Sequence, residues 1–201
     1  MDLVLKDVED STPIVLHPPA MTDDGFYDFC QRYDGFRIER MANGSVVIMA
    51  PTGFETGFRN SDLARQLGSW AKRDGRGAAF DSNTEYILRD GSALSPDASW
   101  VRWERIKQLS AKQKRKFPRL CPDFVVELIS PTDRRTQVKS KMQRWIKNGV
   151  ELGWLIDPDK RAVTIYRPDS EPQTLANPNQ VNGEGPVSGF VLDLKNIWAG
   201  L

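Results

Sequence analysis

"CPDFVVELISPTDRRTQVKSKMQRWIKNGVELGWLIDP", residues 121–158, reads as a strand, a helix and a second strand. A strand is expected over 123–129, where apolar residues fill 124–129 with one exception. A helix is expected over 132–148 with Gly149 as its stop, and an apolar strand follows at 152–157. Two strands joined by a helix within about 35 residues are typical of a crossover between parallel neighbours. The segment therefore predicts an α/β fold with a mixed β-sheet.

The exception is Glu127, which interrupts the most apolar strand of the chain. Taking a carboxylate out of water costs several kcal/mol unless something pairs with it. Lysines follow on the predicted helix, so Glu127 is either matched by a cation or bound to a metal ion.

Further elements are predicted on both sides of this unit. The expected helices are 23–33, with Thr22 as N-cap, and 55–72, which Asp74-Gly75 ends. The expected strands are a hairpin around Asn43-Gly44, a strand or strand pair in 78–91, one from about Asp97, the segment 162–168, and a last short strand in 189–194. The Pro-, Asn- and Gly-rich segment 170–189 is expected to be a loop.

Neither a repeat nor a linker interrupts the chain, so residues 1–201 are expected to form one domain, with 1–20 as an extended N-terminal segment. This segment holds the only histidine, His17, and two prolines after it disfavour a helix there. With a single histidine and no partner motif, the sequence disfavours Ser-His-Asp, Cys-His and multi-histidine zinc chemistry.

Composition limits the remaining classes of function. The 201 residues are 39% hydrophobic, which suits one ordinary soluble domain, and the net charge of +1 means that any basic surface must be local. Cys30 and Cys121 match no metal-ligand spacing and are expected to be reduced thiols, with a single disulfide as the alternative. Neither a membrane span of ~18 apolar residues nor a signal-peptide layout occurs, so a cytoplasmic location is expected.

Two acidic residues are predicted to lie on adjacent strands. Asp97 follows Pro96 at the start of one strand and Glu127 lies on the next, so both carboxylates could sit side by side, with Glu55 as a third oxygen donor. Carboxylates that share a point repel each other, and a divalent cation such as Mg²⁺ is the usual reason to tolerate them. The alternatives are a buried ion pair for Glu127 and a strand or turn cap for Asp97.

Several motifs in one order resemble the Uma-two family of bacterial proteins, a domain of unknown function in the PD-(D/E)XK, or restriction-endonuclease-like, nuclease superfamily. The resemblance is carried by MAPTGFETGFRN, FDSNTEY, SPDASWV, CPDFVVELISPTDRR, KMQRWIKNGVELGWLIDP, IYRP and GFVLDL, and it covers most of the chain beyond residue 20. It implies a restriction-endonuclease-like core, in which a mixed β-sheet is flanked by helices in the order α-β-β-β-α-β, with extra hairpins.

The chain departs from the superfamily pattern at one point. An acidic residue and a lysine usually lie two apart on one strand, but the residue two after Glu127 is Ile129. The resemblance implies that the lysine has moved to the following helix as Lys141. Geometry alone leaves Lys139 open, because both lysines flank the predicted apolar stripe of Val138, Met142, Trp145 and Ile146.

The resemblance implies a metal-dependent endonuclease that needs no organic cofactor and acts on DNA. Asp97 and Glu127 would hold Mg²⁺, or Mn²⁺, Lys141 would position water or stabilise charge on the phosphate, and Glu55 would assist. The rival hypothesis is a catalytically silent nucleic-acid-binding or interaction protein in which Glu127 and Lys141 form a structural ion pair. Family habit and exposed sheet edges suggest a homodimer.

A basic segment offers a contact surface for DNA. Residues 105–119 hold seven cations and no acidic residue, and we expect Lys112, Lys114, Arg115 and Lys116 to contact phosphates; the other cations are Arg105, Lys107 and Arg119. The alternative is a solvated helical hairpin that keeps the protein soluble. The tryptophans at 100, 103, 145, 154 and 198 are interpreted as core residues rather than base-stacking groups.

Overall fold

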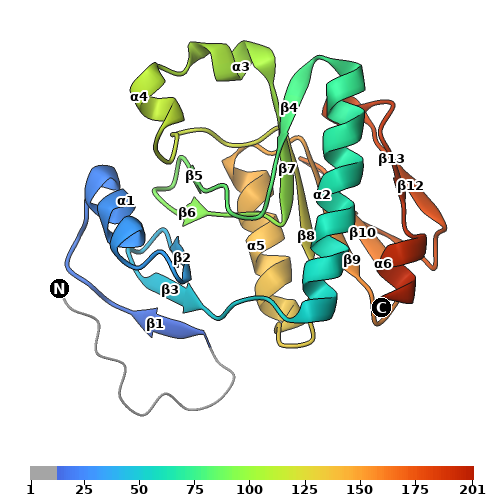
Figure 1. Ribbon diagram of the computed structural model, residues 1–201, viewed down its shortest axis with the longest axis horizontal. Helices are drawn as coiled ribbons and strands as arrows, with labels where there is room; N and C mark the ends of the chain where they lie inside the picture. The colour runs from blue at the N-terminus through green and yellow to red at the C-terminus, as the bar shows by residue number, and fades with distance from the viewer. Residues whose placement is uncertain (1–12) are drawn as a thin grey trace.

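The computed structural model describes residues 13–201 (Figure 1). The part of the expected N-terminal segment that lies in 1–12 is outside these residues. In the described part of this segment, Ile14–Leu16 form strand β1, which pairs antiparallel with β3 (Val46–Met49).

The centre of the molecule is a six-stranded sheet in the order β11-β10-β9-β8-β7-β4. The predicted crossover is confirmed, because β8 (Phe124–Leu128) and β9 (Leu152–Asp157) are parallel neighbours joined through α5 (Arg135–Asn148). The other pairs of this sheet are antiparallel. Its remaining strands are β4 (Gly77–Phe80), β7 (Ala98–Arg102), β10 (Ala162–Tyr166) and β11 (Gln173–Ala176).

Helices cover both faces of this sheet. Phe124, Val126 and Leu128 of β8 pack with apolar side chains of α2 (Phe54–Asp74), whereas Val125 packs with Met142 and Trp145 of α5. A strand points alternate side chains to opposite faces, so Glu127 shares the face of Val125. Where α5 approaches β9, a Cβ on Gly153 would overlap the end of the Met142 side chain, which would have to shift.

A second sheet lies beside α5 (Figure 1). Its order is β1-β3-β2-β6-β5, and it packs against α1 (Asp23–Arg32) through Phe26. The predicted hairpin joins β2 (Arg37–Arg40) to β3, and Gly44 turns the chain with φ of 85°. The short strands β5 (Tyr86–Ile87) and β6 (Ala93–Leu94) complete this sheet. The basic segment forms two short helices, α3 (Trp103–Gln108) and α4 (Ala111–Lys114).

Three expectations about local structure were wrong: the start of α5, the burial of Trp103 and the segment 170–189 as a loop. Helix α5 begins at Arg135 rather than near Thr132, because Asp133 accepts the Ser130 N–H at 2.8 Å and residues 130–133 form a turn instead. Trp103 is 41% exposed, since the chain has left the sheet and starts α3 there.

The segment 170–189 is not one loop. It contains β11, β12 (Gln180–Asn182) and the 3-10 turn η1 (Gly185–Val187), and β12 pairs with β13 (Val191–Asp193) before α6 (Lys195–Ala199) ends the chain. Its turn-forming residues separate short edge strands instead of excluding them. Both cysteines are free thiols, as expected. Within residues 13–201, no helix is long and apolar enough to cross a membrane.

Candidate functional site

Asp97 and Glu127 lie opposite each other on adjacent strands. The antiparallel register pairs Ala98 with Val126, and Asp97 donates its N–H to the Val126 carbonyl at 3.0 Å, so one further step places Asp97 beside Glu127. Both side chains are buried, and Glu127 shares the α5 face of the sheet with Val125. Like charges directly opposite on neighbouring strands destabilise a sheet, so this pair requires positive charge nearby.

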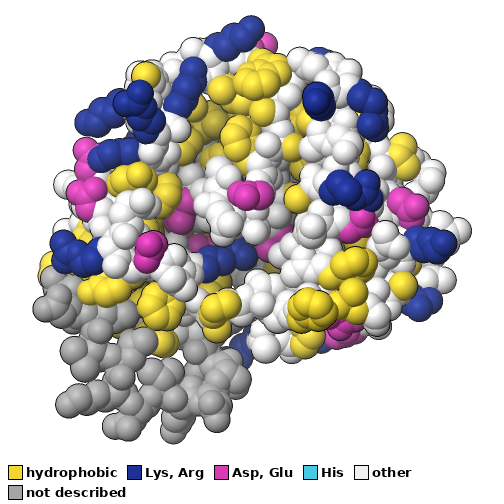
Figure 2. Space-filling view, viewed as in Figure 1, with side chains coloured by type: hydrophobic (Ala, Val, Ile, Leu, Met, Phe, Trp, Pro, Cys, Tyr) yellow, Lys and Arg dark blue, Asp and Glu magenta, His cyan; other side chains and the backbone are white. Residues whose placement is uncertain are grey.

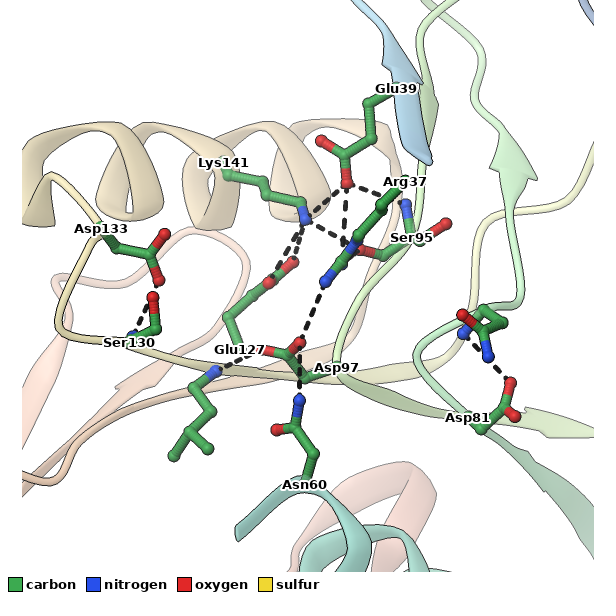
Figure 3. Close-up of polar contacts among 12 residues, drawn as sticks. Arg37, Glu39, Asn60, Asp81, Ser95, Asp97, Glu127, Ser130, Asp133 and Lys141 are labelled. Atoms are coloured by element: carbon green, nitrogen blue, oxygen red, sulfur yellow. Dashed lines mark hydrogen bonds and ion pairs between the residues drawn. The ribbon is translucent and has the colours of Figure 1, made fainter. Parts of the chain in front are cut away.

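Lys141 supplies part of that charge from α5. Its Nζ lies 3.1 Å from Glu127 Oε1, and it donates to Glu39 Oε1 at 2.7 Å and to the Ser95 carbonyl at 2.8 Å (Figure 3). Trp145, one turn later on the same helix face, donates its indole N–H to Glu127 Oε1 at 2.8 Å. The carboxylate of Glu127 is therefore oriented by two residues of one helix.

Strand β2 contributes two residues that the sequence interpretation missed. Arg37 and Glu39 are two apart and thus share one face of the strand. Arg37 Nη1 lies 3.3 Å from Asp97 Oδ1, and Glu39 accepts the Ser95 N–H at 3.2 Å in addition to Lys141. The only signal was the pattern RIER, which puts two charged residues on the face opposite Ile38. Figure 3 shows their side chains turned toward Asp97 and Lys141.

The charges in this cluster do not balance. Three carboxylates, Glu39, Asp97 and Glu127, face two cations, Arg37 and Lys141, which leaves one negative charge when all five are ionised. Burial, reinforced by Asp97 and Glu39, raises the pKa of Glu127 to about 7 against the opposing effect of Lys141. Burial would lower the pKa of Lys141, but Glu127 and Glu39 outweigh it and raise that pKa. The site therefore has an unmet preference for positive charge.

Glu85 is a further buried carboxyl near this cluster. Its Oε1 has no hydrogen-bond partner within the described chain, and burial, together with the charge of Glu39, raises its pKa well above the ordinary value. The folded protein thus binds a proton that the unfolded chain releases near pH 4.5, so Glu85 makes stability fall as pH rises above that value.

We expect Glu85→Gln to remove this dependence. The amide cannot ionise, so the variant should gain free energy of unfolding relative to wild type at about pH 8 and little at about pH 4. Urea unfolding at the two pH values measures the difference, with the exposed Glu171→Gln as the control. An equal change at both pH values would contradict a protonated Glu85.

The other two residues considered for the site, Glu55 and Lys139, lie apart from the Asp97, Glu127 and Lys141 cluster. Glu55 bonds to Arg59 at 3.0 Å and lies against Gly200, and no hydrogen bond or ion pair within residues 13–201 joins it to Asp97, Glu127 or Lys141. Lys139 is exposed, whereas Lys141 reaches the cluster. From α2 it is Asn60, not Glu55, that approaches Asp97, with 3.5 Å between Nδ2 and Oδ1.

The basic segment is partly neutralised. Lys116 and Lys112 lie 2.7 and 3.8 Å from the carboxylate of Asp24, and Arg105 and Arg119 pair with Asp123 and Asp23. Among residues 13–201, Lys107, Lys114 and Arg115 have no ion-pair partner. Figure 2 shows Lys and Arg side chains gathered over α3 and α4, beside a hollow that lies over α5 and has charged side chains at its floor.

The donor set suits a hard divalent cation. Asp97 and Glu127 offer carboxylate oxygens, which Mg²⁺ and Mn²⁺ prefer, and the excess negative charge favours a cation between them. In the part of the chain that is described, no three His, Cys, Asp or Glu side chains form a metal-binding group. A metal ion here would therefore complete its coordination with a main-chain carbonyl and water, as Mg²⁺ commonly does.

Comparisons with known proteins agree with the fold. A family model, Uma2, described as "Putative restriction endonuclease", matches residues 23–195. A crystal structure from Anabaena variabilis ATCC 29413, described as "a putative nuclease belonging to DUF820", superposes with a TM-score of 0.71 at 23% identity, over 90% of this chain and 98% of that chain. No curated protein matches the sequence.

Proposed function

The chain belongs to the Uma2 family, and from this premise we propose that it is a Mg²⁺-dependent nuclease that hydrolyses phosphodiester bonds in DNA. The observation that carries the proposal is the convergence of three buried or half-buried side chains: Asp97 just before β7, Glu127 on β8 and Lys141 on α5. Two opposed carboxylates can hold a divalent metal ion, and a lysine beside them can stabilise charge on a phosphate during hydrolysis. The resemblance of the sequence motifs points to the same three residues.

In this proposal Asp97 and Glu127 hold the metal ion. The ion would supply a Lewis acid for the phosphate and lower the pKa of the attacking water. The protein orients its two ligands before the ion arrives: the Leu128 N–H donates to Asp97 Oδ2 at 2.7 Å, and the Trp145 indole donates to Glu127. Such fixed partners hold ligating carboxylates in one orientation and tune their affinity.

Lys141 supplies a positive charge at the site. Its pKa is raised, so it stays an ammonium at neutral pH and can stabilise negative charge that develops on the phosphate. Glu39 is a positioning residue, because its carboxylate and the Ser95 carbonyl fix the direction of the Lys141 Nζ. Loss of the Glu39 carboxylate would leave the ammonium with only the Ser95 carbonyl and Glu127 as partners.

A cleavage assay tests the proposal. Single- and double-stranded DNA and RNA are incubated with the protein in Mg²⁺, in Mn²⁺ and in chelator, over a salt series. We expect cleavage of DNA in either metal and none in chelator. Cleavage should weaken as salt rises, because phosphate contacts by the exposed Lys114 and Arg115, and by Lys112 and Lys116, release counterions. Activity that survives chelator would exclude the two-carboxylate metal mechanism.

A second candidate function is supported by the same contacts. Lys141 already has three partners, Glu39, Glu127 and the Ser95 carbonyl, so it could serve only to neutralise buried charge in a catalytically silent nucleic-acid-binding or interaction protein. The two functions differ in divalent metal binding. Calorimetry that detects no Mn²⁺ or Mg²⁺ binding at millimolar metal favours the silent protein.

A further inference from the structure

Arg37 neutralises the negative charge of Asp97, the role that a bound metal ion would also have. Its Nη1 lies 3.3 Å from Asp97 Oδ1, while Asp97 Oδ2 is bonded to the Leu128 N–H. Within residues 13–201, Arg37 is the only cation paired with Asp97, and the other group at Oδ1 is the neutral amide of Asn60 at 3.5 Å. The oxygen of Asp97 that is not bound to backbone is thus occupied by a guanidinium.

The hydrogen bonding of Arg37 is incomplete. Its Nη2 donates to the Ser95 carbonyl and lies 3.8 Å from Glu39 Oε1, but its Nε is buried and has no partner among the described residues. A buried donor without a partner destabilises the folded state. The attraction of the Asp97 and Glu39 carboxylates therefore holds the guanidinium here, although its hydrogen bonds are not all made.

A divalent ion and this guanidinium cannot share the carboxylate oxygen without strong repulsion. Two positive charges a few ångströms apart in a partly buried site cost several kcal/mol even at an effective dielectric constant of about 20. The ion has the higher charge and also faces Glu127, which Arg37 does not contact through any hydrogen bond or ion pair within residues 13–201. Arg37 keeps Glu39 as a carboxylate partner when it leaves Asp97.

We propose that Arg37 is the resident counter-cation of Asp97 in the metal-free protein and competes with the divalent metal for this carboxylate. The inference rests on the metal site of the proposed function. It assigns Arg37 a role in setting metal affinity: the guanidinium stabilises the Asp97 carboxylate when no metal ion is bound, so metal binding must displace it. Because β2 belongs to the second sheet, the displaced contact also joins that sheet to Asp97, which immediately precedes β7.

Metal affinity measured with Mn²⁺ alone tests this role without any nucleic acid. We expect Arg37→Met to bind Mn²⁺ about tenfold more tightly than wild type or better, because the competing charge is gone. Calorimetry gives the affinity, and Trp145, bonded to Glu127, offers a second readout through sensitised Tb³⁺ luminescence. The matched control is Arg40→Met, which removes an arginine of the same strand that pairs with Asp23 at 2.8 Å and should leave the affinity within about twofold.

The outcomes distinguish a failure of the competition by Arg37 from a failure of the metal site itself. Equal or weaker Mn²⁺ binding by Arg37→Met, beside clear binding by wild type, overturns the competition and leaves the metal site intact. If neither protein binds Mn²⁺, the metal site and the competition both fail. Should Arg37→Met not fold, Arg37→Gln replaces it, since the amide can still donate to the Ser95 carbonyl without carrying charge. The same tightening is expected, and its absence overturns the inference.

Discussion

Lys141→Met is expected to lower the single-turnover rate of DNA cleavage by about a hundredfold or more, the scale of losing one preorganised charge at a reacting phosphate. Methionine keeps most of the lysine stem, and Asp97 and Glu127 remain, so metal binding should persist. Quenched-flow cleavage with enzyme in excess over DNA measures the chemical step directly.

The same substitution should also affect stability, because Lys141 pairs with both Glu39 and Glu127. In chelator we expect the free energy of unfolding to fall by about 3 kcal/mol, since buried carboxylates lose their partner. Mn²⁺ should restore part of this loss by supplying positive charge, while the cleavage rate stays low.

Lys139→Met is the matched control. Lys139 lies on the same helix but is exposed, so its replacement should leave both rate and stability nearly unchanged. A Lys141→Met protein that cleaves DNA at the wild-type rate per folded molecule, or a larger rate loss in Lys139→Met, would show that Lys141 has no chemical role. A stability loss without a rate loss would favour the structural ion pair.

The largest effect is expected at Asp97. Asp97→Asn should lower cleavage by about a thousandfold, because metal-ion catalysis is worth several kcal/mol and each 1.4 kcal/mol is about tenfold. The asparagine oxygen can still accept the Leu128 N–H, so the strand pairing should survive. Cleavage rates and Mn²⁺ calorimetry measure the loss.

Asp133→Asn serves as the control for Asp97→Asn. Asp133 is an exposed carboxylate in the turn before α5, and its amide can keep the contact to Ser130. Its cleavage rate should match that of wild type. If Asp97→Asn cleaves DNA as fast as this control, then Asp97 is not a metal ligand.

The sequence predicted the parts of the fold that depend on local pattern. Apolar periodicity and turn residues were enough for the β8-α5-β9 crossover and for α2, which Gly75 ends with φ of 74°. Adjacent strands then implied that Asp97 and Glu127 would be neighbours, and their register places them opposite each other. The short strands in 170–189 were missed because Pro, Asn and Gly dominate the segment, although β11 and β12 each pair with the strand next to it in sequence, β10 and β13.

The contributions of Arg37 and Glu39 could not be predicted from local pattern. Glu39 and Lys141 are 102 positions apart, and they meet only because the second sheet, which contains β2, packs beside α5. Glu85 was missed for the same reason, since nothing in its own segment shows that it is buried next to Glu39 and Lys141. Helical periodicity also left Lys139 and Lys141 equivalent, and it is packing that brings Lys141 to Glu127.

The most direct test of the account is metal add-back to chelator-stripped protein. Wild type and Asp97→Asn are purified in parallel, stripped and incubated with linear duplex DNA before and after addition of Mg²⁺. We predict no cleavage by either protein before addition, and cleavage by wild type alone afterwards. Cleavage by stripped wild type without metal, or equal cleavage by both proteins after addition, would contradict a metal-dependent nuclease site built on Asp97 and Glu127.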